Sequence, residues 1–187
     1  MKTRHLLAAL CLLTLPAFGA SSDDYYRQGM VAINRGDEVA ARRAFTEALR
    51  LNPSHANARY QLNKLPEMRD TLTQRKKTAE LSSVKLPEVT FSGASLQEAL
   101  EALNHMIEKE SGKEDKAKAI VPNFMIQDPS GKLAEREVDL RLKNVPAKAV
   151  LDYLLQQAGA TVRYDEHATV IRPASAAAKQ SEANADE

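Results

Sequence analysis

The chain has 187 residues, of which 27% are charged, with a formal net charge of +1 at pH 7 and a single cysteine. This near-neutral balance argues against nucleic acid as a partner, because phosphate binding needs a strongly basic face. One cysteine cannot form an intramolecular disulfide or a multi-thiolate metal site.

Residues 1–19 have the pattern of a secretory signal peptide. Lys2 and Arg4 make a short positive region, and an apolar run follows it from Leu6 to Leu15. Because this run is too short to span a bilayer, we expect a cleaved export signal rather than a membrane helix. An uncleaved N-terminal anchor is the alternative.

Small residues mark the expected cleavage site. Ala17 and Gly19 occupy its −3 and −1 positions, and Ala20 and Ser21 are rival cut points. Cys11 lies inside the apolar run, which does not fit a lipoprotein site. We therefore expect a periplasmic or otherwise exported protein, without a bilayer-spanning segment after cleavage.

Residues 23–56 predict two antiparallel helices joined by a tight turn at residues 35–37. In that turn Gly36 is free to adopt a positive φ, and Asp37 is able to cap the second helix. Pro53 stops the second helix after its last turn.

Small and aromatic residues recur at fixed spacing in this hairpin: Tyr25, Gly29, Ala41, Phe45, Ala48 and Pro53. The set resembles a tetratricopeptide repeat, whose unit of about 34 residues has these residue types at these offsets. Helices approach closely only where side chains are small, so we expect Gly29 to face Ala41 and Phe45 to fill the space between the helices. Gln28 and Ala32 depart from the family pattern, and an ordinary helical hairpin is the alternative.

A third helix, from Ser54 to Lys64 with Ser54 as its N-cap, is expected to complete a helical unit over residues 22–65. Pro66 interrupts what would be a second repeat. Since one repeat buries little apolar surface, it needs support from the rest of the chain or from a partner. Residues 66–85 are expected to form a charged linker helix.

Residues 86–173 predict a second unit, which makes the fold class α+β. Ser95 and Glu98 form a capping box before a helix, and EVDLRLKNV alternates as a half-buried strand does. Two strand–helix segments align at a shift of 51 residues. The predicted order is β-α-β-β-α-β-β, with two helices on one face of a small sheet, over residues 89–91, 96–107, 119–126, 138–142, 146–158, 161–164 and 169–172.

This half resembles the short N-terminal domain of secretins and TonB-dependent receptors. The resemblance rests on VTFSGASLQEALEALN and EVDLRLKNVPAKAVLDYLLQQAGATVRYDEHATVIRP, and residues 108–118 are an insertion. It implies a periplasmic interaction module that stacks in a secretin ring or contacts a signalling partner. A membrane β-barrel normally follows this domain, whereas residues 174–187 are expected to be a disordered tail, so we do not expect the chain itself to be a pore.

The sequence predicts no catalytic, cofactor or metal site, and we expect no enzyme. His55, His105 and His167 fall in different predicted elements without the spacing of metal ligands. The segment DPSGKL has Ile126 and Leu133 at positions where a phosphate loop needs glycine and serine or threonine.

Partner binding is expected instead at the second helix of this half. Tyr153 and Leu155 are apolar residues off its inward stripe, which makes them candidate contacts. Val89–Phe91 and Thr169–Arg172 are expected to be short edge strands guarded by prolines, which favours helix surfaces over strand addition.

The sequence therefore predicts an exported adaptor that binds protein partners in the cell envelope, such as a secretin or another outer-membrane protein. One alternative is a regulatory module that contacts a membrane protein's periplasmic segment. A second alternative is an atypical envelope hydrolase.

Overall fold

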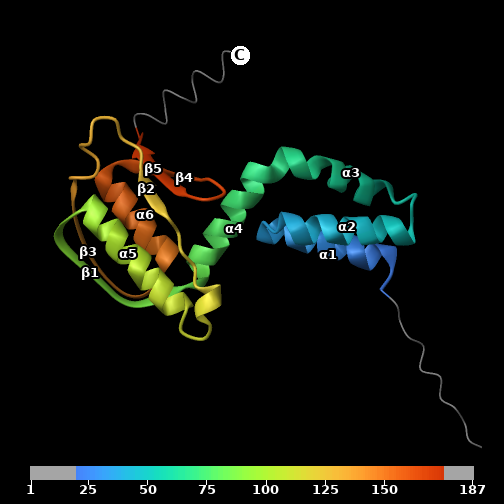
Figure 1. The fold of residues 1–187 in the computed structure, drawn as a ribbon, viewed down its shortest axis with the longest axis horizontal. Helices are drawn as coiled ribbons and strands as arrows, with labels where there is room; N and C mark the ends of the chain where they lie inside the picture. The colour runs from blue at the N-terminus through green and yellow to red at the C-terminus, as the bar shows by residue number, and fades with distance from the viewer. Residues whose placement is uncertain (1–19, 175–187) are drawn as a thin grey trace, which may run out of the picture.

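The computed structural model describes residues 20–174, which form a helical unit and an α+β unit joined through one helix (Figure 1). The expected α+β class is confirmed, while the expected signal peptide and residues 175–187 lie outside the described part. The helices are α1 (Ser22–Arg35), α2 (Glu38–Leu51), α3 (Ala56–Lys64), η1 (Leu65–Met68), α4 (Arg69–Ser83), α5 (Leu96–Ser111), η2 (Lys116–Lys118) and α6 (Ala147–Ala158). The strands are β1 (Lys85–Ser95), β2 (Phe124–Ile126), β3 (Glu137–Pro146), β4 (Ala160–Tyr164) and β5 (Thr169–Pro173).

Local capping fixes the ends of α1 and α2. The Ser21 hydroxyl accepts a hydrogen bond from the Asp24 backbone N–H at 3.2 Å, and the Asp24 carboxylate accepts one from the Ser21 N–H at 2.8 Å. The Ser21 N–H, the Ser21 hydroxyl and Arg27 all donate hydrogen bonds to the Asp24 carboxylate, and these bonds lower the pKa of Asp24 to about 2. Gly36 ends α1 with a left-handed φ of 76°, and Asp37 begins α2 by accepting a hydrogen bond from the Ala40 N–H.

The helical unit is packed around the ring of Phe45. We expected Gly29 to face Ala41. The atoms nearest to a Cβ added at Gly29 are instead carbons of the Phe45 ring, the closest at 2.4 Å. The ring is fully buried and contacts Tyr26 at 5.9 Å between centroids. The buried residues of this core are Ala32, Ile33, Ala41, Phe45, Ala48, Ala58, Leu65 and Leu72.

Helix α3 begins one residue later than expected, because its N-cap is His55 rather than Ser54. The His55 Nδ1 atom accepts a hydrogen bond from the Ala58 N–H at 3.2 Å. The Ser54 N–H donates to Asn52 Oδ1 at 3.1 Å, which places Ser54 in the turn before the helix. The imidazole also packs on Tyr26, with ring centroids 5.1 Å apart, which orients the cap.

Helix α4 belongs to both cores and is more than the charged linker expected for residues 66–85. Leu72 is buried in the helical unit, whereas Leu81 is buried in the core of the α+β unit. The α4 backbone also lies directly on the turn between α1 and α2, because a Cβ atom at Gly36 would be 2.3 Å from the Leu72 carbonyl oxygen and 2.4 Å from the Lys76 nitrogen. Figure 1 shows α4 running from one unit to the other.

The α+β unit contains two sheets, where the sequence predicted one. Strands β1 and β3 form an antiparallel ribbon, and a second sheet has the order β2-β5-β4, with β5 parallel to β2 and antiparallel to β4. The segment expected as the edge strand Thr169–Arg172 therefore lies in the centre of its sheet. It is flanked on both sides because β5 pairs with β4 and also with β2, which lies 45 residues earlier in the chain.

Strand β1 is longer than the three residues predicted. It passes through Pro87 and through a bulge between Phe91 and Ala94, where Gly93 has a φ of 59°. The Gly93 N–H donates to Asp139 Oδ1 at 2.9 Å, which fixes the bulge against β3. In contrast, β2 covers only residues 124–126 of the strand predicted over 119–126.

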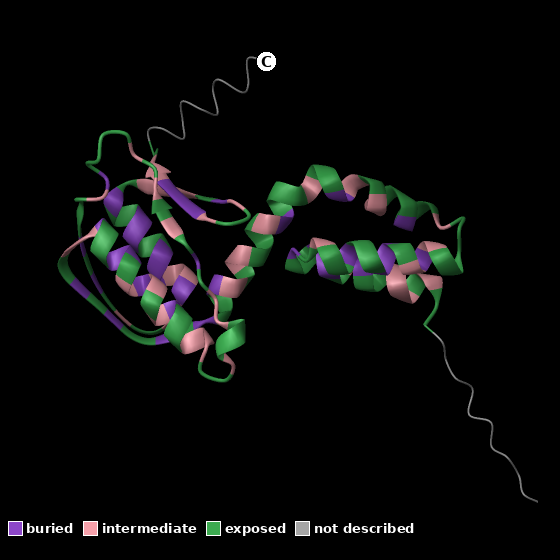
Figure 2. Cartoon of the chain, in the orientation of Figure 1, coloured by how far each residue is buried: buried purple, intermediate pink, exposed green. Residues whose placement is uncertain are grey.

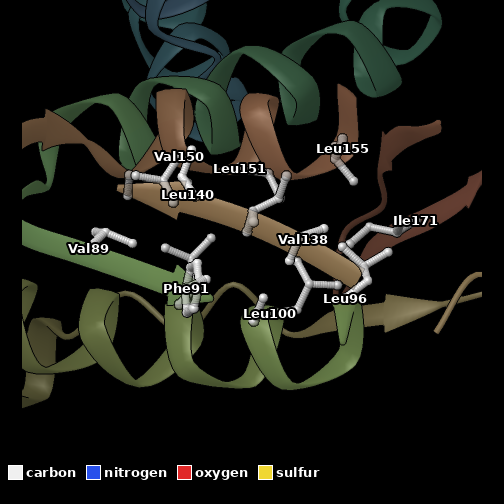
Figure 3. Packing of buried hydrophobic residues seen from close by; sticks show 14 of the residues in the cluster. Val89, Phe91, Leu96, Leu100, Val138, Leu140, Val150, Leu151, Leu155 and Ile171 are labelled. Atoms are coloured by element: carbon white, nitrogen blue, oxygen red, sulfur yellow. The ribbon is translucent and has the colours of Figure 1, made fainter. Parts of the chain in front are cut away.

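Apolar side chains from both sheets and both helices share the core of the α+β unit. Figure 3 shows residues of β1, β3, α5, α6 and β5 in this core, among them Phe91, Leu100, Leu140 and Ile171. Figure 2 shows the buried residues on the facing sides of α1 and α2 and throughout the interior of this unit. The α5 and α6 helices thus pack on the β1–β3 ribbon and also contact β2 and β4 of the second sheet.

Candidate functional site

The predicted repeat positions build the helical unit and do not form a binding surface. Gly29, Ala41, Phe45 and Ala48 are buried between the helices. Tyr25 packs at the margin of this core, and Pro53 follows the end of α2. Binding by this unit therefore has to use side chains outside the repeat pattern.

Within residues 20–174, no three or more histidine, cysteine, aspartate or glutamate side chains lie together in a group that could hold a metal ion. His55 caps α3, His105 lies on the surface of α5, and His167 lies in the turn between β4 and β5. The histidines thus lie in separate elements, as the sequence predicted.

The DPSGKL segment is organised around the carboxylate of Asp128. The backbone N–H groups of Leu133 and Ser130 donate to its two oxygens at 2.8 and 3.0 Å. These hydrogen bonds, that from Leu133 first, lower the pKa of Asp128. The backbone N–H groups that a bound phosphate would need already donate to this carboxylate, and the Leu133 side chain is buried. The loop therefore has a structural role.

Of the two predicted partner contacts on α6, only Tyr153 is on the surface. Tyr153 is 49% exposed, whereas Leu155 is 4% exposed and belongs to the core (Figure 3). The prediction for Leu155 is wrong because α6 contacts β3 on one side and α4 and β4 on another. A helix covered from two directions buries a wider stripe than a helix that packs on a single sheet face.

Strand β2 is the open edge of the three-stranded sheet. The Asn123 carbonyl accepts a hydrogen bond from the Thr169 N–H at 3.0 Å, and the Gln127 N–H donates to the Ile171 carbonyl at 2.8 Å. Since alternate residues of a strand direct their backbone groups to opposite sides, Phe124 and Ile126 direct theirs away from β5. No other strand of the described part pairs with β2 on that side.

A groove of 490 Å³ lies between this edge and helix α5. Phe124 and Ile126 line it from β2, and their half-buried side chains pack on the main core. The facing wall comes from successive turns of α5 and consists of Gln97, Leu100, Glu101, Asn104 and His105.

The α5 wall of this groove carries an unsatisfied acceptor. Asn104 Oδ1 is buried and has no hydrogen-bond partner. A buried polar atom without a partner is costly and commonly marks a position that a ligand or water fills. One turn earlier, the exposed Glu101 carboxylate accepts a hydrogen bond from Gln97 Nε2 at 3.1 Å, so this wall presents the acceptors of Glu101 and Asn104 beside the exposed His105.

The opposite edge of the same sheet is covered. Helix α4 contacts β4, and Tyr164 at the end of β4 is 8% exposed. Burial raises the pKa of Tyr164, and its hydroxyl, although near Thr78, makes no hydrogen bond of good geometry. A polar groove of 970 Å³ remains between α4, β4 and the turn that contains Gly36.

The sequence did not indicate the groove residues on β2. Strand β2 has three residues, too few for an alternating pattern, and its partner β5 lies 45 residues further along the chain. The open positions Phe124 and Ile126 follow from the parallel pairing, which no local signal reveals. Asn104 was visible only as a polar residue beside the apolar stripe of α5.

Comparison of the chain with models of protein families, with characterised proteins and with solved structures found no significant match.

Proposed function

We propose that the chain is an exported adaptor that binds protein partners in the bacterial cell envelope. The observation that carries this proposal is that α4 holds two separately packed units together while both units leave large apolar side chains exposed. The exposed residues are Val31, Val39, Leu51 and Tyr60 on the helical unit and Val121, Met125 and Tyr153 on the α+β unit. Two units held together by one helix that is buried in both cores suit a protein that bridges partners.

The sequence supports the location and the class of partner. The pattern of residues 1–19 is that of an export signal. The resemblance of residues 86–173 to the short N-terminal domain of secretins and TonB-dependent receptors favours a periplasmic interaction module, with a secretin or other outer-membrane protein as partner. In the described residues no helix is long and apolar enough to cross a membrane.

The open edge of β2 favours a second candidate function. A regulatory module that contacts a membrane protein's periplasmic segment would need a site for an extended chain, and a free strand edge beside a groove is such a site. This candidate differs from the first in the partner and not in the location.

Photo-crosslinking in intact cells tests the adaptor function. A photoreactive residue would replace Tyr60, which is 60% exposed on the helical unit, with the exposed position Glu114 as control. We expect an adduct between position 60 and an envelope protein, which mass spectrometry identifies. If that protein is a secretin, the result favours the adaptor function. If it is a membrane protein with a periplasmic segment, the result favours the regulatory module. Adducts only with cytoplasmic proteins, or equal adducts from both positions, would refute the proposal.

Export is tested separately by the N-terminus of the envelope-fraction protein. We expect it to begin near Ala20, immediately before the Ser21 cap of α1. An envelope-fraction protein that begins at Met1 would contradict cleavage.

A further inference from the structure

We infer that the open edge of β2 binds an extended peptide segment of a partner protein and that this segment carries a lysine or arginine side chain. The inference deepens the proposed adaptor function and rests on it. It concerns the groove between β2 and α5 described above.

The first argument is the free backbone of β2. Phe124 and Ile126 direct their N–H and C=O groups away from β5, so an incoming strand finds two donors and two acceptors. Met125 between them is 49% exposed and Val121 just before the strand is 47% exposed. This edge has exposed apolar neighbours and no charged residue within β2, so its protection is limited to its shortness and to the preceding Pro122.

The second argument is that this edge is held rigidly. Thr169 Oγ1 donates to the Pro122 carbonyl at 2.8 Å, and Asn123 Nδ2 donates to the His167 carbonyl at 3.1 Å. At the other end of β2, Arg172 Nε donates to Gln127 Oε1 at 2.8 Å. Because both ends of β2 are fixed to the β4–β5 hairpin, little ordering of the edge would oppose binding.

The third argument comes from the other strand edges of residues 20–174, each of which is covered or interrupted at some point. Helix α4 covers β4, and the Gln157 amide occupies the backbone of Asp139 on β3, with bonds of 3.0 and 2.7 Å. Strand β1 contains Pro87 and the bulge at Gly93. The edge of β2 differs from them in that it lies beside a groove lined by Phe124 and Ile126.

The acceptor groups that line the groove favour a basic side chain on the partner's segment. The buried Asn104 Oδ1 lacks a donor, and the Glu101 carboxylate lies on the next turn of α5. A guanidinium or ammonium group brings several donors and a positive charge and so would satisfy both acceptors. An acidic side chain would bring no donor to Asn104 Oδ1 and would place like charges together at Glu101.

The same chemistry disfavours the chain's own C-terminal segment as the occupant. Residues 175–187 contain Lys179 but also Glu182, Asp186 and Glu187, so their balance is acidic. A segment of this charge does not complement Glu101.

A peptide-binding measurement on the full chain tests the inference. The probe is a fluorescent ten-residue peptide that alternates valine and threonine and carries one central arginine. Two matched controls replace the arginine with glutamate or methylate the backbone nitrogens along one edge. We expect the arginine peptide to bind about three- to tenfold more tightly than the glutamate peptide, as for a partly exposed ion pair. The methylated peptide should lose binding by at least about tenfold, because it has lost its donors.

A charge reversal identifies the site. In Glu101→Arg the preference should invert toward the glutamate peptide, whereas Glu114→Arg, with the same change of net charge outside the groove, should bind as the wild type does. Amide exchange of Phe124 and Ile126 should slow on binding by about tenfold. Equal binding of all three peptides, or an unchanged preference in Glu101→Arg, would overturn the inference.

Two further results would assign the edge to another occupant and so overturn the inference. Protection of Phe124 and Ile126 that is present in the free protein and disappears on deletion of residues 175–187 would assign the edge to the chain's own end. Protection that depends on protein concentration would assign it to a second copy.

Crosslinking in cells separates this inference from the adaptor function itself. A photoreactive residue at Met125 should capture the same partner that position 60 captures or a second envelope protein, through a peptide containing lysine or arginine. Adducts from position 60 without any from position 125 would remove the edge proposal and leave the adaptor proposal standing. Absence of adducts from both positions would remove both.

Discussion

The substitution Gly29→Ala should destabilise the protein, although the same change in an open helix stabilises. Alanine in a helix interior is favoured over glycine by about 0.5–1 kcal/mol. At Gly29, however, the added methyl group would lie 2.4–2.7 Å from three carbons of the Phe45 ring. Carbon atoms normally pack at about 3.5–4.0 Å, so the ring or the helices must move.

The ring of Phe45 is enclosed by its neighbours and cannot shift away from the added methyl group. Its exposed fraction is 0%, and Tyr26 packs against it at 5.9 Å between centroids. Overpacking of a core costs about 1–3 kcal/mol, which offsets the helix-propensity gain and leaves a net loss of up to roughly 2.5 kcal/mol in the free energy of unfolding. Phe45→Ala, which leaves a cavity, should cost about 3–5 kcal/mol.

Denaturant unfolding of single and double variants provides the measurement. Gln28→Ala, an exposed neighbour on α1, should stay within about 0.5 kcal/mol of the wild type and serves as the control. On a Phe45→Leu background the clash is relieved, so Gly29→Ala should become neutral or stabilising, with a coupling of about 1 kcal/mol or more. If Gly29→Ala stabilises equally in both backgrounds, the ring does not lie over Gly29 and the packing argument is refuted.

Three other substitutions test the rest of the fold. Leu155→Ala should lower the free energy of unfolding by about 2–5 kcal/mol because its side chain is in the core, whereas Tyr153→Ala should change it by less than about 0.5 kcal/mol; equal losses in denaturant unfolding would contradict the burial. Gly36→Ala should cost about 1–3 kcal/mol in thermal unfolding, because its φ is 76° and the added Cβ would meet the Leu72 carbonyl at 2.3 Å; an unchanged melting temperature would show that α4 does not lie on this turn. Tyr164→Phe should leave stability near neutral pH unchanged or raise it, because the buried hydroxyl has no hydrogen bond. Burial raises the pKa of Tyr164 above its ordinary value of 10.0, so the wild-type protein should lose stability as the pH rises beyond about 10 and the phenylalanine variant should lack that loss in pH-dependent unfolding.

Local chemistry made several elements predictable from the sequence. The Ser95–Glu98 capping box begins α5 where expected, and Gly159 ends α6 in the left-handed conformation. The turn around Gly36 likewise follows from glycine and from the capping aspartate that comes after it. Each of these signals acts over three or four residues, so a single sequence contains all the information.

Elements that depend on distant contacts were predicted less well. The pairing of β2 with β5 joins residues 45 positions apart, and it decides both that β5 is central and that Phe124 and Ile126 are open. Leu155 was misplaced because the inward stripe of α6 depends on how many neighbours cover the helix. His55 became a cap through its packing on Tyr26, a contact between α1 and the start of α3. The groove at β2 could not be predicted from the sequence, because it also depends on this long-range pairing.

The α+β unit needs helix α4 to keep its core and the β4 side of its sheet covered. A fragment that starts at residue 86 would lose Leu81 and Val84 from its interior and would uncover the β4 side of its sheet. Exposed apolar surface beside an unprotected strand promotes association between copies. We expect such a fragment to precipitate or to form higher-order species in size-exclusion chromatography, whereas a fragment that starts at residue 69 and retains α4 stays monomeric. Limited proteolysis should accordingly cut between α2 and α3 before it cuts anywhere within α4.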